Sequence, residues 1–320
     1  MELCFLGTSS GVPTKTRNVT AVALKESKGK GWFLIDCGEA TQHQLLKTSL
    51  TVNNLQAILI THIHGDHCYG LPGLLASAAM NHRTEPLTII APKGIQDWFE
   101  ATQKFTQLYL PYPIQFIDAE SLPSVTIGQF TIDLTTLTHR VPSFAYRFTE
   151  STIKIYLDFA KLAEHNIPRG PIWGQLVKGE DVVFGDKVLK SRDFTYYAHA
   201  PRRIIIAGDN SEPEKLAEFS HNCHALVHEA TYAKELAEQA KEYGHSYAEL
   251  VARFAEKAQI NNLLLTHFSP RYQTDPNADT SIEQLRREAA QVYRGQLFLA
   301  QDFTRYRMDT QGELEQIFEG

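Results

Sequence analysis

One short stretch of the chain concentrates three histidines and one aspartate, His62, His64, Asp66 and His67. Imidazole and carboxylate groups at this spacing are typical of a metal site that suits zinc best and also accepts manganese, iron or cobalt. In an extended turn His62 and His64 point the same way and can share one ion. Gly65 allows the chain to reverse, so that Asp66 and His67 meet a second ion. The alternative is a chance cluster of unrelated histidines.

The apolar run Ala57-Ile58-Leu59-Ile60 comes directly before these residues, and its length and branching predict a buried strand. The candidate ligands therefore lie on the loop that leaves the carboxyl end of a strand. Open α/β sheets place their active sites at that end. A helix-like run begins at Leu71, after the loop.

These residues match the metallo-β-lactamase superfamily motif His-x-His-x-Asp-His, and the resemblance predicts three further ligands, each at the end of a strand. His139, Asp209 and His267 follow three such apolar or β-favouring runs. The resemblance implies that one ion binds His62, His64 and His139, that the other binds Asp66, His67 and His267, and that Asp209 bridges both. It implies two zinc ions per subunit, with manganese as the alternative metal.

Strand-like and helix-like runs alternate up to position 104 and again after position 204, which predicts an α/β fold with helix-covered sheets. The resemblance specifies the metallo-β-lactamase fold, a four-layer αββα sandwich, as a single domain over residues 1–320. Approximately between 150 and 200 the alternation weakens. The segment Asn166–Gly179 holds two prolines, three glycines and an exposed-looking Trp173, which predicts an inserted flexible arm. The polar tail from Arg305 to Gly320 has no assigned element.

Further motifs resemble ribonuclease Z within that superfamily. The loop before Val19 resembles the family's Pro-x-Lys-x-Arg-Asn segment, so Lys15, Arg17 and Asn18 are expected near the 3′ end of a bound RNA. Gly170 and Pro171 resemble the arm that grips the elbow of a transfer RNA. The Asp36–Gln44 stretch resembles another family signature, with Ala40 where glycine is usual.

Two more family motifs carry the expected proton chemistry. His228-Glu229-Ala230-Thr231 matches a four-residue motif, and Gly244-His245-Ser246 matches the catalytic histidine loop. By resemblance, Asp66 is both a metal ligand and the acceptor of the attacking water's proton. His245 donates a proton to the departing ribose oxygen, and Glu229 orients its ring. Asn210 and Tyr247 stand where the family usually has threonine.

The chain has 320 residues, 43% of them hydrophobic, and a net charge of −6, which excludes a wholesale basic surface. Any nucleic acid must therefore bind a local patch. Cys4, Cys37, Cys68 and Cys223 show no paired spacing, which indicates a reducing cytoplasm, and no signal peptide or membrane span is expected. We expect no organic cofactor.

The sequence therefore predicts a zinc-dependent endoribonuclease that removes the 3′ trailer from precursor tRNA and leaves a 3′-hydroxyl. The family resemblance implies a homodimer. Two alternatives are kept. One is a hydrolase of the same fold that acts on a small phosphodiester, ester or lactam, and the other is a metal-bound RNA-processing subunit without activity.

Overall fold

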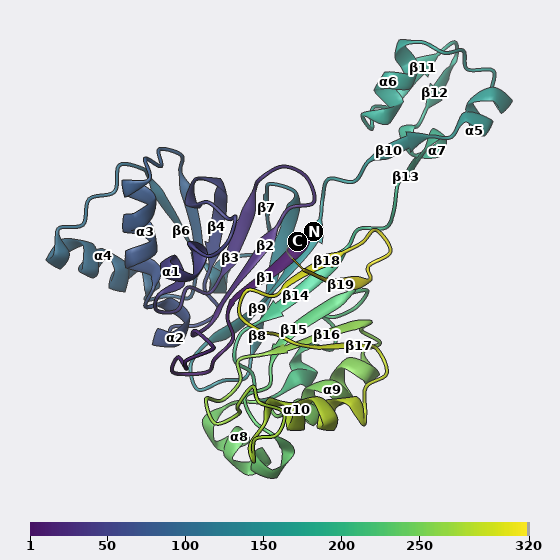
Figure 1. Ribbon diagram of the computed structural model, residues 1–320. Coiled ribbons are helices and arrows are strands. Elements are labelled where there is room, and N and C mark those ends of the chain that lie inside the picture. The colour runs from purple at the N-terminus through teal and green to yellow at the C-terminus, as the bar shows by residue number, and fades with distance from the viewer. Residues whose placement is uncertain (319–320) are drawn as a thin grey trace. The chain divides into compact units, whose positions relative to one another are not determined.

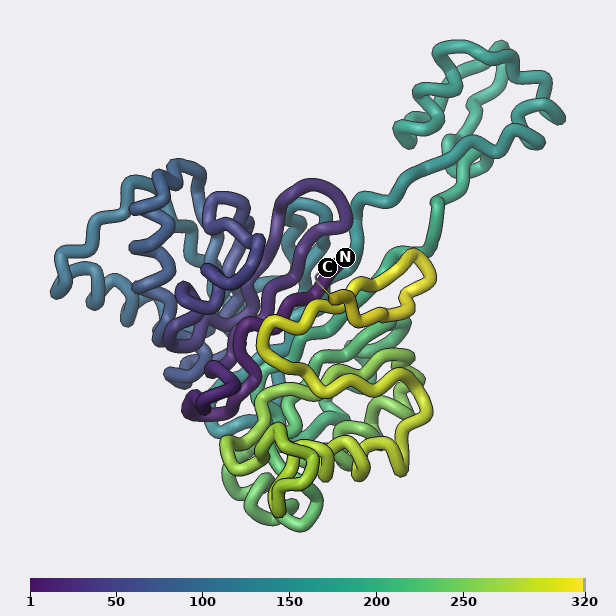
Figure 2. The backbone as a smooth tube through the Cα atoms, in the orientation of Figure 1, coloured from purple at the N-terminus to yellow at the C-terminus, as the bar shows by residue number. Residues whose placement is uncertain are grey.

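A computed structural model describes residues 1–318. The chain forms two compact units, one comprising residues 1–149 together with the chain from Arg202 onward, and the other comprising Glu150–Pro201. The path of the chain in Figure 2 leaves the first unit once and returns to it once. None of the helices within the described residues combines the length and the apolar character needed to cross a bilayer.

The first sheet of the larger unit has eight strands in the order β19-β18-β1-β2-β3-β4-β5-β6. Their bounds are β1 Glu2–Gly7, β2 Ala21–Lys25, β3 Trp32–Ile35, β4 Leu55–Leu59, β5 Leu87–Ala91, β6 Ile114–Asp118, β18 Arg305–Met308 and β19 Leu314–Ile317. Strands β3 to β6 are parallel, whereas β19, β18, β1 and β2 pair antiparallel. The sheet is therefore mixed, and its parallel half carries the helical crossovers.

The second sheet has seven strands in the order β17-β16-β15-β14-β9-β8-β7. Their bounds are β7 Val125–Ile127, β8 Phe130–Leu137, β9 Ser143–Glu150, β14 Arg203–Ala207, β15 Ala225–Glu229, β16 Asn262–Thr266 and β17 Gln296–Leu299. Strands β14 to β17 are parallel, and β9 pairs antiparallel with β14. Parallel strands bring their carboxyl ends to one edge of the sheet.

Figure 1 shows the sheets and helices of this unit. Three apolar cores separate its layers. Side chains alternate along each strand, so Leu3 and Phe5 of β1 face the second sheet while Cys4 and Leu6 face the helices. Helices α1 Thr41–Leu45, α2 Gly65–Cys68, α3 Leu71–Met80 and α4 Ile95–Thr106 cover the first sheet. Helices α9 Ala248–Lys257 and α10 Ile282–Ala290 cover the second. The predicted four-layer αββα sandwich is confirmed.

The remaining elements of the larger unit are short. Helix α8 spans Ala237–Tyr243, and 3-10 turns lie at η1 Val52–Asn54, η2 Ala119–Ser121, η3 Pro213–Leu216 and η4 Lys234–Leu236. Ser281 caps the N-terminus of helix α10, because its Oγ accepts a hydrogen bond from the Glu283 amide at 3.3 Å. Its buried residues Ile282, Leu285 and Ala289 share one face, as expected of an amphipathic helix.

The smaller unit has a core of its own. It contains β10 Ile155–Leu157, α5 Phe159–Glu164, α6 Pro171–Val177, β11 Val182–Phe184, β12 Lys187–Leu189, α7 Ser191–Phe194 and β13 Thr195–Tyr197. Six side chains are buried together in this core: Leu162, Ile167, Leu176, Val182, Leu189 and Phe194. The unit coincides closely with the expected insertion, and its flexibility and its role as an arm stay predictions.

The structure adds elements in two segments to which the sequence assigned none, and it half-buries one side chain that looked exposed. The segment Asn166–Gly179 contains the helix α6, because Pro171 occupies its first turn, where a missing N–H is tolerated. Trp173 is half-buried against Phe159, with ring centroids 5.5 Å apart, and is not exposed. The tail from Arg305 forms the β18–β19 hairpin, in which Tyr306, Met308 and Leu314 are buried; residues 319–320 lie outside the described range.

Candidate metal centre

The predicted metal ligands all follow strands of the sandwich or begin the helix after one. His62 and His64 follow β4, His139 follows β8, and Asp209 and His267 follow the parallel strands β14 and β16. Asp66 and His67 belong to the short helix α2. The two facing sheets therefore bring together residues that are up to 205 positions apart, and this is a consequence of the fold.

The first group of candidate ligands is formed by His62, His64, His139 and Asp209. His64 Nδ1 lies 3.2 Å from His139 Nε2. Oδ2 of Asp209 lies 3.5 Å from His62 Nε2 and 3.7 Å from His139 Nε2. These atoms converge on one point, and His64 presents its Nδ1 where the other two histidines present their Nε2.

The second group is formed by Asp66, His67 and His267. His67 Nε2 and His267 Nε2 are 3.2 Å apart, and Asp66 Oδ2 lies 3.5 and 3.4 Å from them. The other carboxylate oxygen of Asp209, Oδ1, lies 3.5 Å from His67 Nε2 and 3.4 Å from His267 Nε2. Asp209 thus directs one oxygen to each group, which is the geometry of a bridging ligand.

The outward-facing ring nitrogens of four of these histidines have their own partners. His62 Nδ1 lies 3.1 Å from Thr61 Oγ1, His67 Nδ1 lies 2.7 Å from Asp36 Oδ2, His139 Nδ1 lies 2.7 Å from the Gly244 carbonyl, and His267 Nδ1 lies 3.0 Å from Thr231 Oγ1. Partners of this kind fix the orientation of metal-binding imidazoles. His62 Nε2 is buried without a hydrogen-bond partner. This set of donors fits divalent metal ions.

Asp36 and Gly65 show how the histidine loop is held. The Asp36 carboxylate accepts hydrogen bonds from the Thr61 amide at 2.7 Å and from Thr61 Oγ1 at 2.8 Å, in addition to its contact with His67. Gly65 does not reverse the chain as expected, because it begins α2 without a positive φ. A Cβ at Gly65 would lie 2.2 Å from Cε2 of Tyr69, so a larger residue there would displace the exposed Tyr69 ring.

Charges in the centre shift pKa values in opposite directions. Burial would raise the pKa of the Asp209 carboxyl, but the imidazoles of His267, His67 and His62 lower it well below its ordinary value. Burial lowers the pKa of His62, and the neighbouring histidines lower it further. Asp209 is therefore an anion and His62 is neutral near pH 7, as metal ligands must be.

His245 and Glu229 lie at the same edge of the second sheet. His245 Nδ1 is 3.2 Å from Glu229 Oε1 and 3.6 Å from Asp209 Oδ2. Burial would lower the pKa of His245, but the carboxylates of Glu229 and Asp209 raise it to about 9. Glu229 is 1% exposed and His245 keeps 14% of its side chain exposed. A partly accessible, protonated imidazole on a buried carboxylate can act as a general acid.

Asn210 connects the histidine motifs. Its Nδ2 lies 3.0 Å from His228 Nε2, and its Oδ1 accepts a hydrogen bond from the Thr138 amide at 3.2 Å. Its carbonyl accepts a hydrogen bond from Ser246 Oγ at 2.6 Å. The asparagine at this position therefore ties the strand end before His139 to the end of β15, which carries Glu229, and to the loop that carries His245.

The three candidate RNA-binding residues of the N-terminal loop differ in exposure. Lys15 is exposed, and Asn18 is half-buried with its side-chain amide donating to the Glu39 carbonyl at 2.8 Å. Arg17 is only 4% exposed, and its Nη2 donates to the carbonyls of Ser269 and Tyr272 at 3.3 and 2.6 Å. In this structure the buried guanidinium of Arg17 braces two loops, and its predicted role in binding RNA stays a prediction. Gly170 and Pro171 belong to the smaller unit.

Sequence reasoning missed two polar residues. Asp302 accepts hydrogen bonds from Thr8 Oγ1 and the Asn18 amide, both at 2.7 Å, and so anchors the N-terminal loop. Arg271 is exposed, and its guanidinium carbon lies 5.6 Å from the ring centroid of Tyr232, which itself packs on His245. The position of Arg271 four residues after the ligand His267 was the available signal.

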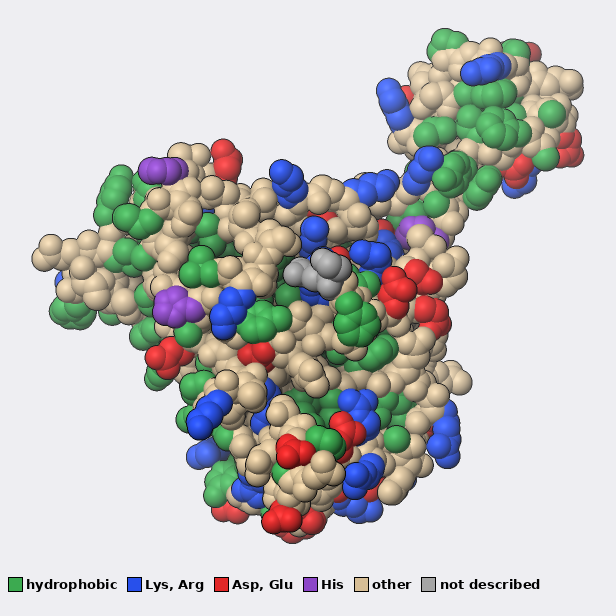
Figure 3. Space-filling view, viewed as in Figure 1, with side chains coloured by type: hydrophobic (Ala, Val, Ile, Leu, Met, Phe, Trp, Pro, Cys, Tyr) green, Lys and Arg blue, Asp and Glu red, His purple; other side chains and the backbone are tan. Residues whose placement is uncertain are grey.

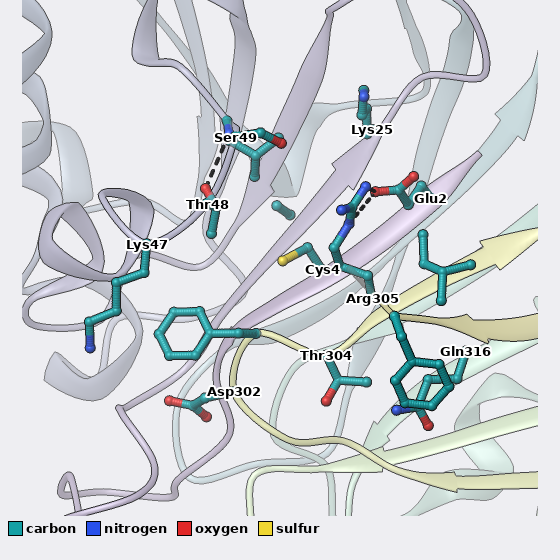
Figure 4. Close-up of a pocket in the computed structure, with 15 residues that line it drawn as sticks. Glu2, Cys4, Lys25, Lys47, Thr48, Ser49, Asp302, Thr304, Arg305 and Gln316 are labelled. Carbon is teal, nitrogen blue, oxygen red and sulfur yellow. Dashed lines mark hydrogen bonds and ion pairs between the residues drawn. The ribbon is translucent and has the colours of Figure 1, made fainter. Parts of the chain in front are cut away.

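A cavity of about 290 Å³ lies elsewhere in the larger unit, between β1, the chain after α1 and the C-terminal hairpin (Figure 4). Its lining includes Asp302 and none of the candidate metal ligands. Arg305 in its wall pairs with Glu2 at 2.7 Å. On the face shown in Figure 3, cationic and anionic side chains of the larger unit are interspersed, as the net charge predicts.

Comparison with known proteins decides the family. The chain is 47% identical over 318 residues to "Ribonuclease Z" of Pseudomonas putida (strain W619), with 99% of each chain covered. The chain belongs to the ribonuclease Z family. The crystal structure of human tRNase Z, short form, superposes on this chain with a TM-score of 0.65 and 27% sequence identity. The match covers 95% of this chain and 98% of that one. A family profile described as Anti-Pycsar protein Apyc1 matches residues 1–146.

The fold has a second structural match. The metallo-β-lactamase fold protein YhfI from Bacillus subtilis has a TM-score of 0.66 at 19% identity, covering 95% of this chain and 98% of that one, and this likeness shows the fold alone. Membership of the ribonuclease Z family makes the chain a metal-dependent endoribonuclease. The His and Asp clusters are where a ribonuclease Z of this sequence can hold metal.

Proposed function

We propose that this ribonuclease Z cleaves precursor tRNA at the 3′ trailer and leaves a 3′-hydroxyl on the tRNA, with two zinc ions bound per subunit. The observation that carries the proposal is the placement of Asp209, whose two carboxylate oxygens reach the two ligand groups 3.4 to 3.7 Å away. His245 and Glu229 lie beside the same carboxylate. A dinuclear centre with an adjacent acid is suited to hydrolysis of a phosphodiester with a poor leaving group.

The assignment of ligands follows the two groups. His62, His64 and His139 would hold one ion, Asp66, His67 and His267 would hold the other, and Asp209 would bridge them. Bound ions would lower the pKa of water at the site and stabilise negative charge on the attacked phosphate. Zinc suits this ligand set, and manganese is the alternative.

The proposed proton transfers use residues of this chain. The Asp66 carboxylate accepts a proton from the attacking water, and the Gly11 amide holds its Oδ2 at 2.7 Å. His245 donates a proton to the ribose oxygen that leaves, because Glu229 favours its charged form. Glu229 is fixed in turn by the amides of Ser246 and Thr231 at 2.8 and 3.0 Å.

Precursor tRNA is the proposed partner. "Ribonuclease Z" and "tRNase Z" are the names of the relatives, and the exposed Lys15 gives the N-terminal loop a cation for the RNA 3′ end. The smaller unit, with Gly170 and Pro171 at the start of α6, is proposed as the arm that binds the tRNA away from the cut. We further propose a homodimer located in the cytoplasm, where the buried cysteines Cys37, Cys68 and Cys223 stay reduced.

The decisive experiment is cleavage of an in vitro transcribed precursor tRNA by the zinc-loaded protein, with the product ends mapped. We expect a tRNA that ends in a 3′-hydroxyl and a trailer with a 5′-phosphate. His64→Ala should lose cleavage and still bind the RNA. Hydrolysis of bis(p-nitrophenyl) phosphate without any cleavage of the precursor would favour the small-phosphodiester alternative and refute the proposal.

The role of the arm needs a separate variant. Replacing residues 152–199 with a short Gly/Ser linker removes the whole second core, whereas a smaller deletion would split its buried residues. We expect the KM for precursor tRNA to rise strongly and hydrolysis of the small diester to persist, because remote contacts supply binding energy and not the nucleophile. Light scattering should give twice the 36.1 kDa chain mass for the intact protein.

A further inference from the structure

Asn210 is a buried asparagine in the loop that follows β14, next to the proposed bridging residue Asp209. Its side chain makes three hydrogen bonds. Oδ1 accepts from the amides of Thr138 and Glu212, both at 3.2 Å, and Nδ2 lies 3.0 Å from His228 Nε2. The side chain is 0% exposed, so it does not touch a bound RNA. Any effect that it has on cleavage must act through the residues around it.

The neighbouring His228 decides how the Asn210 amide is oriented. His228 Nδ1 lies 2.7 Å from the Glu229 carbonyl, which can only accept, so Nδ1 carries the proton. Burial lowers the pKa of His228 and keeps the ring neutral, so its Nε2 is an acceptor. Asn210 must therefore direct its NH₂ group to His228 and its oxygen to the two amides. A flipped amide would break all three hydrogen bonds.

The Asn210 side chain links strand ends that the sheet itself does not join. In the strand order β15-β14-β9-β8, the strand β9 lies between β14 and β8. Thr138 follows β8 and precedes the candidate ligand His139 in the turn to β9. The Thr138 carbonyl also accepts hydrogen bonds from the Ser211 amide at 2.8 Å and from Ser211 Oγ at 3.1 Å. The loop after β14 therefore holds the turn that carries His139, across β9.

The same asparagine reaches the acid through its main chain. Its amide donates to Glu229 Oε1 at 3.3 Å, and its carbonyl accepts from Ser246 Oγ at 2.6 Å. Ser246 directly follows His245 in the chain. The side chain holds His228, which precedes Glu229 in β15. One residue thus contacts the turn with a candidate ligand, the strand with the carboxylate and the loop with the acid.

We propose that Asn210 is a positioning residue that sets the place of the proton donor His245 relative to the ligand His139, and that His228 fixes its amide. The inference rests on the proposed function, in which His245 protonates the leaving ribose oxygen. A small displacement of a proton donor slows a reaction whose leaving group needs the proton. The same displacement has little effect on a leaving group that departs without one.

The test compares Asn210→Val with Asn210→Thr at a saturating zinc concentration. The two new side chains have nearly the same shape, and only threonine has a hydroxyl that can accept from the Thr138 amide and donate to His228. We expect Asn210→Val to lower kcat for precursor tRNA roughly 10- to 100-fold, the usual effect of losing a residue that orients a metal ligand. Asn210→Thr should recover most of that loss. KM should stay unchanged in both variants, because the buried side chain adds no contact to RNA.

Asn262→Val is the matched control, because Asn262 is also buried and lies at the end of β16 that is remote from the candidate ligands. Its side chain likewise makes three hydrogen bonds, with the carbonyls of His224 and Gly312 at 2.6 and 2.9 Å and with the Leu314 amide at 3.1 Å. Both valine variants should lower the midpoint of urea denaturation, whereas Asn262→Val should keep the kcat of the wild-type protein. This contrast separates positioning from loss of stability.

Two further measurements do not depend on the folding of Asn210→Val. His228→Phe cannot accept from Asn210 and should lower kcat for precursor tRNA, whereas His228→Gln, whose side-chain oxygen can accept, should lower it less. In the wild-type protein, nitrogen NMR of the histidine rings should show His228 protonated at Nδ1 and unprotonated at Nε2. The His228 signals are assigned by their loss in His228→Gln.

Hydrolysis of bis(p-nitrophenyl) phosphate completes the test, because its leaving group needs no proton. Asn210→Val should lose far less activity on this diester than on precursor tRNA. Equal losses on the two substrates, wild-type kcat in Asn210→Val, or no recovery in Asn210→Thr would overturn the role of Asn210. A His228 ring protonated at Nε2 would do the same. Wild-type protein that does not cleave precursor tRNA refutes the proposed function instead.

Discussion

Replacing Glu229 by glutamine tests the acid and its support together. Both oxygens of the Glu229 carboxylate face hydrogen-bond donors. Oε1 faces the Ser246 amide at 2.8 Å, the Asn210 amide at 3.3 Å and His245 Nδ1 at 3.2 Å. Oε2 accepts hydrogen bonds from the Thr231 amide at 3.0 Å and from Thr231 Oγ1 at 2.7 Å. A glutamine keeps one oxygen and brings an NH₂ group into this acceptor site.

The less disruptive orientation puts the NH₂ group at the position of Oε2. Thr231 Oγ1 can then accept from it and donate to the His267 carbonyl, which lies 3.0 Å away. The buried Thr231 amide loses its acceptor, and one such loss costs roughly 1–3 kcal/mol. We expect Glu229→Gln to lower the free energy of unfolding by about that amount in urea denaturation, and the control Glu238→Gln, on the exposed face of α8, to stay within about 0.5 kcal/mol.

The same substitution removes one of the two charges, those of Glu229 and Asp209, that raise the pKa of His245 to about 9. The acid form of His245 is present below that pKa and is lost as the pH rises through it. Cleavage of precursor tRNA should therefore decline above about pH 9 in the wild-type protein, and this decline should move to lower pH in Glu229→Gln. An unchanged stability together with an unchanged pH profile would refute both the acceptor-only geometry and the role of Glu229.

Three further predictions address the acid, the bridge and the backbone. His245→Ala should lower kcat for RNA roughly 10²–10⁴-fold while a p-nitrophenyl diester, whose leaving group needs no proton, is spared; equal losses on both substrates would assign His245 to positioning. Asp209→Ala should lose both metals in equilibrium dialysis, because its oxygens face both ligand groups, and retention of two tightly bound ions would rule out a bridging role. Ala40 has φ 61°, a left-handed conformation that costs an L-residue roughly 1–2 kcal/mol, whereas glycine costs roughly 0.4–1 kcal/mol through the greater chain entropy of the unfolded state. Ala40→Gly should therefore raise the free energy of unfolding by about 0.5–1 kcal/mol in urea denaturation. Ala101→Gly within α4 should lower it, and a change of the same sign at both positions would contradict this account.

Much of the fold and of the candidate centre was predictable because local patterns carry it. The strands before His62 and His267 and the helix at Leu71 are mainly apolar segments that the local sequence displays. The convergence of seven ligands rested on the family resemblance, because no local pattern tells which strand ends meet across two sheets. The geometry then supplied what the motif lacks, namely the separate directions of the two Asp209 oxygens.

The remaining features depend on tertiary contacts that the sequence does not display. The sequence indicates that Arg17 is a cation available to RNA. In the structure its guanidinium is buried and donates to two carbonyls that lie 252 and 255 positions away in the chain. The polar tail forms a hairpin because the edge of β1 is available to pair with β18. The sequence did not predict helix α6, because a proline is common both in the first turn of a helix and in a loop. The burial of Leu176 with Leu162 in the core of the smaller unit, which distinguishes the two, is not visible in the sequence.

The smaller unit enters the larger one through strands that are direct neighbours, since Thr149 of β9 pairs with Arg203 of β14. Because the inserted segment leaves and returns at neighbouring positions of one sheet, the entropy of closing it grows only slowly with its length. The insertion can therefore change in length without altering the register of the sheet that carries Asp209. If the smaller unit binds RNA as proposed, the candidate metal centre and the RNA-binding segment can change independently of each other.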